Sequence, residues 1–108
     1  MNKIDECIVA CENCTSDCIK MGNIDCVNSC IVCERVCKCL KVAMKFDSEN
    51  TELIKSLKES CVIACKKCVK KCDKSKMKCC IICVKKCNKL IDSLGNKNKG
   101  NKSKKVKK

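Results

Sequence analysis

The chain has 108 residues, a formal net charge of +13, seventeen cysteines, a single aromatic residue, and neither histidine nor proline. Its length fits one domain, and the scarcity of aromatic side chains argues against an all-β sandwich. Because a histidine base, a Gly-rich phosphate loop and a serine nucleophile pattern are all missing from the sequence, we expect no enzyme.

Capping signals predict the first two helices. The first helix should begin near Asn2 to Asp5 and stop at Gly22, a residue type that often ends helices in the left-handed conformation. Asn23 is then a candidate N-cap for the second helix, with Asp25 favourable in its first turn. This second helix should run to about Lys45.

Two further helices are predicted after a polar break. The third should run from about Glu49 to Cys72, and the fourth from about Lys76 to Ser93, ended by Gly95. Because the connections are short, neighbouring helices must be antiparallel. We therefore predict an all-α fold over residues 1–95, an antiparallel up-down-up-down four-helix bundle.

Cysteines recur at helical spacing in all four segments. The pattern C-x3-C-x2-C-x3-C occurs three times, and a fourth copy lacks its first thiol. The repeats comprise Cys7, Cys11, Cys14, Cys18; Cys26, Cys30, Cys33, Cys37; Cys61, Cys65, Cys68, Cys72; and Cys80, Cys83, Cys87. Positions spaced 4, 3 and 4 apart fall within about 60° on a helix, on the face that normally carries Leu, Ile and Val. The sequence therefore predicts a cysteine-lined core.

Cysteine this dense also occurs in secreted disulfide scaffolds. The odd number of cysteines, their helical spacing and the lack of a visible export signal argue against that alternative. With no long apolar run either, we expect a cytoplasmic protein that does not span a membrane. A core of metal-free thiols is a further alternative, because free cysteine packs as a small hydrophobe.

Thiolates without histidine select soft or borderline ions, which leaves Cu(I), zinc and iron–sulfur clusters. The ferredoxin spacings are absent. Cu(I) needs only two or three sulfurs, and each Cu⁺ replaces one thiol proton, so a filled core stays neutral. Separate four-cysteine zinc sites would bury negative charge, which is costly. We therefore predict a protein that binds many Cu(I) ions per chain. The alternative is a zinc-binding metallothionein-like or structural protein.

The repeated segments, over about residues 6–91, resemble the cysteine-rich four-helix-bundle copper storage proteins of the cytosolic bacterial type. The resemblance implies storage or detoxification of many Cu(I) ions by the fifteen repeat cysteines, commonly in a homotetramer. Cys39 and Cys79 lie off the repeat and are further candidate metal ligands. Lys76 occupies the place where the fourth repeat would begin and disfavours copper there, unless Cys79 substitutes.

The helix faces predict two different bundle ends. A hydrocarbon plug should lie beside the connection between the second and third helices, formed by Ile4, Leu40, Met44, Leu53, Ile54, Leu57, Leu90 and Leu94. The opposite end carries Met21 and Met77, and we expect metal to enter there. The alternative role of these two residues is gap-filling, which is common for methionine.

The residues after the bundle form a basic tail. Seven lysines and no acidic residue lie in residues 96–108, which we predict to be disordered. The segment has no aromatic residue to stack on bases, so solubility explains its charge better than nucleic-acid binding.

Overall fold

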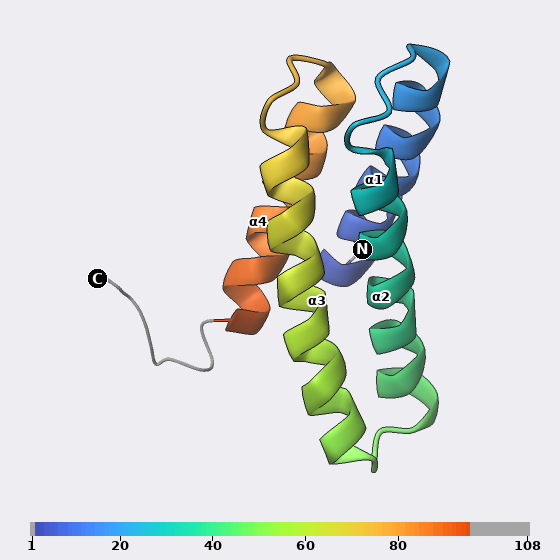
Figure 1. Ribbon diagram of the computed structural model, residues 1–108. Coiled ribbons are helices and arrows are strands. Elements are labelled where there is room, and N and C mark those ends of the chain that lie inside the picture. Colours follow the sequence, from blue (N-terminus) through green and yellow to red (C-terminus); the bar gives the residue numbers. More distant parts are fainter. Residues whose placement is uncertain (1, 96–108) are drawn as a thin grey trace, which may run out of the picture.

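The computed structural model describes residues 2–95, and within them the chain forms four α-helices and no strand (Figure 1). They are α1 (Lys3–Lys20), α2 (Val27–Phe46), α3 (Thr51–Cys72) and α4 (Lys78–Gly95). The predicted Lys-rich tail, residues 96–108, lies outside the described residues, so the division at residue 95 stays a prediction. Within residues 2–95, no helix combines the length and apolar composition needed to cross a membrane.

The helices form a ring in which α1 packs on α2, α2 on α3, α3 on α4 and α4 on α1. Contacts between α2 and α3 run in opposite directions along the chain: Cys30 meets Cys72 at 3.7 Å, and Cys37 meets Cys61 at 3.1 Å. The α1–α2 and α3–α4 connections therefore lie at one end of the molecule, at the top in Figure 1. The all-α four-helix bundle predicted from the sequence is confirmed.

Local capping interactions define both ends of α1 and the start of α3. The side chains of Asn2 and Asn50 accept backbone N–H groups at the starts of α1 and α3. Gly22 has φ of +74° and ends α1, with its own N–H bonded to the carbonyl of Ile19 and the next N–H bonded to the carbonyl of Cys18. These two bonds form a Schellman motif, which satisfies carbonyls that a helix end leaves free.

The predicted start of the second helix is wrong. α2 begins at Val27, with Cys26 in the N-cap position and without a side-chain cap, so Asp25 precedes the helix. Asn23 lies before the N-cap position and does not cap the helix; its side-chain Nδ2 instead donates to Ser75 Oγ at 3.4 Å and to Met77 Sδ at 3.6 Å. Asn23 therefore joins the two connections at the top of the bundle instead of starting a helix.

The hydrocarbon plug is present but smaller than predicted. Leu40 and Leu90 are fully buried at the end of the bundle that holds the α2–α3 connection. The partly buried residues packed against the core there are Ile4, Ile54, Leu57 and Leu94. Met44 and Leu53, which were predicted to belong to the plug, are 43% and 40% exposed. Both lie toward the outer edge of the helix face, where solvent reaches them.

Candidate metal centre

The core of the bundle is made of sulfur. All fifteen repeat cysteines are at most 1% exposed, and all seventeen cysteines are free thiols. The 4, 3, 4 spacing explains this burial, because it places every repeat thiol on the face that each helix turns toward the bundle axis. Apart from Leu40 and Leu90, few large side chains are fully buried. The thiols therefore take the place of a conventional hydrocarbon core.

The thiols form a continuous network that runs toward the plug from the end holding the α1–α2 and α3–α4 connections, which we call the open end. Contacts of 3.3–4.0 Å between Sγ atoms connect fourteen of them. Cys37 and Cys61 form a separate pair at 3.1 Å, one helical turn from the plug. Sulfur atoms this close can share metal ions between neighbouring helices.

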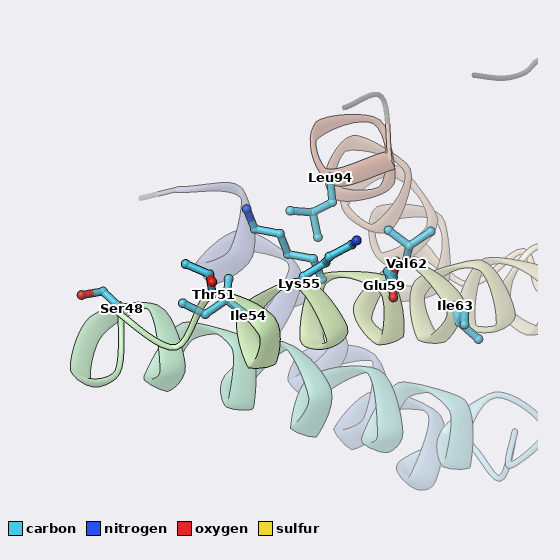
Figure 2. A pocket seen from close by; sticks show the side chains of 9 residues that line it. Ser48, Thr51, Ile54, Lys55, Glu59, Val62, Ile63 and Leu94 are labelled. Carbon is cyan, nitrogen blue, oxygen red and sulfur yellow. The ribbon is translucent and has the colours of Figure 1, made fainter. Parts of the chain in front are cut away.

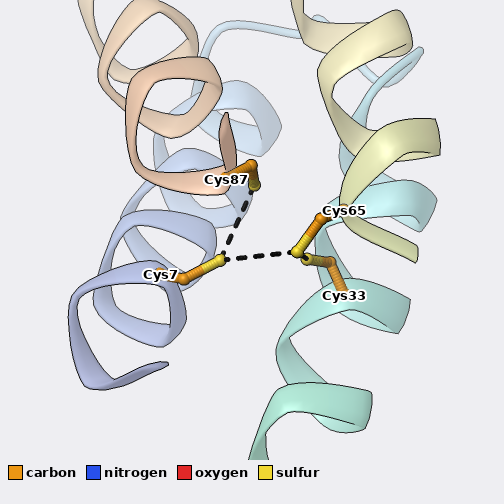
Figure 3. Close-up of side chains that lie close together, drawn as sticks. All are labelled: Cys7, Cys33, Cys65 and Cys87. Carbon is orange, nitrogen blue, oxygen red and sulfur yellow. Dashed lines mark hydrogen bonds between the residues drawn. The ribbon is translucent and has the colours of Figure 1, made fainter. Parts of the chain in front are cut away.

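One layer of the network takes a thiol from each helix. Cys7, Cys33, Cys65 and Cys87 point toward one another across the bundle axis (Figure 3). Cys7 Sγ lies 3.6 Å from Cys87 Sγ and 4.0 Å from Cys65 Sγ, and Cys33 Sγ lies 3.5 Å from Cys65 Sγ. In this layer, the shared repeat brings one thiol from each of the four helices to the same point on the bundle axis.

At the open end, Cys79 joins the network. It is half-buried, and its Sγ lies 3.9 Å from that of Cys18, in a group that also holds Cys14 and Cys80. Lys76, at the position of the missing repeat thiol, is exposed to solvent. Cys79 therefore supplies sulfur at the corner where the fourth repeat lacks it.

The three remaining candidate residues have different surroundings. Met77 is half-buried against the core, and its Sδ accepts the Asn23 amide. Met21 is 72% exposed and ends α1 on the outside. Cys39 is also exposed and lines a shallow apolar groove with Val42 and other residues of α2 and α3. The sequence pattern did not identify Asn23 as a residue of the open end, although its place in a loop at that end was a usable signal.

Packing of the thiols shifts their pKa values in both directions. The hydrogen bond with Cys37 is the main cause that lowers the pKa of Cys61 to about 5, because it stabilises the thiolate. At the open end, burial raises the pKa of Cys26 to about 11 and that of Cys79 to about 12, because desolvation disfavours the thiolate. A metal ion that binds Cys26 or Cys79 must therefore displace a thiol proton.

A groove on the outer surface of the bundle is lined by charged and aliphatic side chains and not by thiols. The groove lies between α3 and the end of α4, and its lining includes Lys55, Lys58, Glu59, Ile54 and Leu94 (Figure 2). It contains no sulfur ligand, since the thiols of both helices face the opposite way. The chemistry of this molecule therefore lies in its core.

The fold and the site define a class of protein: a helical bundle whose interior is a reservoir of soft ligands for many metal ions. The family model of copper storage proteins matches residues 1–96, so the chain belongs to the copper storage protein family. Neither the curated proteins nor the solved structures include a match to it. The protein binds and stores Cu(I) through thiolates lining the bundle core.

Proposed function

We propose that sixteen cysteines, the fifteen of the repeats and Cys79, are the Cu(I) ligands of this store. The network of fourteen thiols and the neighbouring pair of Cys37 and Cys61 carry the proposal. Cu(I) accepts two or three sulfurs, so thiols 3.3–4.0 Å apart, within one helix and between helices, suit ions bridged by shared thiolates. Each Cu⁺ replaces one proton, and the filled core remains neutral. Exposed Cys39 takes no part.

We propose that copper enters between the α1–α2 and α3–α4 connections. The other end is closed by the fully buried Leu40 and Leu90. At the open end, the half-buried Cys79 and Met77 offer soft sulfur between solvent and the buried thiols. Met21 is too exposed to bridge that distance, so we assign entry to Met77 and Cys79.

We propose that the protein acts in a compartment that keeps thiols reduced. Seventeen free cysteines suit the cytoplasm, where disulfides are rare, and storage requires no chemical reaction. We also propose a homo-oligomer, a tetramer by resemblance to the family. Exposed aliphatic side chains such as Ile63 and Ile81, at 68% and 58% exposure, support subunit contacts on α3 and α4.

An anaerobic titration tests the storage proposal. Fully reduced protein is titrated with Cu(I) against a chromogenic chelator, and we expect roughly ten or more ions per chain if copper and thiolate bind about one to one. Cys39→Ser should keep the full capacity, because the exposed thiol lies outside the network. Saturation of the wild-type chain at only a few ions would contradict the proposal.

A further inference from the structure

Three groups of four thiols in the core share no residue with one another. Within each group the Sγ atoms all lie within 4.8 Å. The groups are Cys7, Cys33, Cys65, Cys87; Cys14, Cys18, Cys79, Cys80; and Cys30, Cys68, Cys72, Cys83. They occupy successive levels of the bundle and use twelve of the seventeen cysteines.

The closest Sγ contacts within these groups match the edges of a tetrahedral thiolate site, and the remaining separations are at most 4.8 Å. Zinc binds thiolate sulfur at about 2.3 Å, and a regular tetrahedron with that bond has edges of about 3.8 Å. The contacts in the group at the open end are 3.6–3.9 Å. Those in the group around Cys30 are 3.6–4.0 Å, and those in the group around Cys7 are 3.5–4.0 Å. Little movement is needed to close each group around one ion.

The charge of the bundle also suits such sites. A divalent ion that binds four thiols releases four protons and leaves a site of charge −2, so three sites carry −6. The seven lysines after residue 95 account for +7 of the formal +13, which leaves +6 on the rest of the chain. These cations lie on the outside, as Lys66, Lys67, Lys70 and Lys71 do on α3. Their attraction for the anionic sites offsets part of the desolvation penalty of burying negative charge.

We propose that the reduced, copper-free bundle binds three tetrahedral divalent ions of the zinc and cadmium type, one in each four-thiol group. Such ions prefer four sulfurs, whereas Cu(I) is satisfied by two or three. The same core therefore has two states: one with three divalent ions and one with many Cu(I) ions. Because both use the same thiols, Cu(I) displaces the divalent ions as it fills the network.

Cadmium is the direct probe. Reduced full-length protein is titrated anaerobically with Cd²⁺, and absorption from thiolate-to-metal charge transfer should rise linearly and break at three equivalents. The ¹¹³Cd NMR spectrum should show three resonances in the range of four-sulfur coordination. In a parallel sample, X-ray absorption of bound Zn²⁺ should show four sulfurs at about 2.3 Å. A break at another stoichiometry, or coordination by fewer than four sulfurs, overturns the proposal.

Matched variants locate the sites. Cys87→Ala removes a ligand from the four-helix layer and also from the overlapping group of Cys11, Cys33 and Cys68, so the break should fall to two equivalents. Cys39→Ala, which alters an exposed thiol, should keep three. A break at three in a folded Cys87→Ala chain overturns the assignment. If circular dichroism shows that this variant is unfolded, Cys79→Ser at the half-buried open end replaces it, with the same expected loss.

A Cu(I) titration of the same preparation separates this proposal from the storage function. Uptake of many Cu(I) ions without the three-equivalent cadmium break overturns the divalent sites alone. Failure of both titrations overturns the storage proposal as well. Addition of Cu(I) to the cadmium-loaded protein should release all three Cd²⁺ ions, and retention of cadmium would contradict the shared use of thiols.

Discussion

At the scale of the residue, the chemistry of this protein depends on where single sulfur atoms lie relative to the bundle surface. Cys79 lies off the repeat but joins the thiol network, whereas Cys39, also off the repeat, is exposed. The two methionines separate in the same way, with Met77 against the core and Met21 in solvent. Residue type alone therefore does not decide a role in copper binding.

The methionine pair provides a matched test of copper entry. We expect Met77→Leu to slow Cu(I) uptake several-fold without reducing the final capacity, because leucine fills the space but cannot bind copper. Met21→Leu should leave the rate unchanged, since this side chain is 72% exposed. Stopped-flow uptake from a Cu(I) donor complex measures both. Equal rates for wild type and Met77→Leu would remove Met77 from the entry path.

Leu40 provides the test of the plug. Leu40→Ala should lower the free energy of unfolding of the copper-free protein by about 2–5 kcal/mol, because the side chain is fully buried and its loss leaves a cavity. Leu53→Ala, a substitution at a 40% exposed position, should cost much less. Urea unfolding of the reduced proteins measures the difference. Similar losses in the two variants would show that Leu40 does not close the bundle.

At the scale of the helix, polar contacts on the surface align α1 with its two neighbours. Lys86 of α4 binds Glu6 at 3.0 Å, and Lys38 of α2 binds Glu12 at 3.0 Å. The core itself contains small side chains with little shape to fix register. These cross-helix ion pairs therefore help to set how the thiol columns face one another, although each exposed pair stabilises the fold only modestly.

The pair of Glu6 and Lys86 predicts a pH effect. The hydrogen bond from Lys86 lowers the pKa of Glu6 below its usual 4.5. Its contribution to stability is therefore present above pH 4.5 and is lost as the pH falls through the lowered pKa. Glu6→Gln should unfold at lower urea concentration than wild type at neutral pH, and the gap should close on acidification. A gap that is constant with pH would contradict this account.

At the scale of the whole molecule, filling the core is a proton exchange. Burial raises the pKa of Cys26 to about 11 and that of Cys79 to about 12, so both are protonated near neutral pH. Each Cu(I) bound by such a thiol releases a proton into solvent. The same exchange keeps the interior neutral, which allows many ions to occupy a small volume.

Copper affinity should therefore increase with pH. For each proton displaced from Cys26 or Cys79, the apparent Kd should fall about tenfold per pH unit from about pH 6 to about pH 8, because these two thiols stay protonated over this range. Competition against a Cu(I) chelator of known pH dependence measures it. An affinity that does not change with pH would show that copper binds thiols that are already deprotonated.

The sequence by itself determined the helices, their antiparallel order and the cysteine-lined core. Spacings of 4, 3 and 4 place a thiol on the same helix face at each step, whatever the neighbouring helix is. The short connections then leave one bundle topology, and the repeats indicate soft-metal storage. Gly22 ends α1 as predicted, because capping is a local interaction.

Only the tertiary structure decided which residues complete the core at its ends. Asn23 was predicted to cap α2, but its amide binds Ser75 and Met77 from a connection more than fifty residues away. The placement of Cys79 inside the network depends likewise on contact with Cys18 of another helix. The grouping of thiols in fours also depends on contacts between helices. Local periodicity cannot specify these contacts, because they are set by how the helices are offset and rotated when they pack.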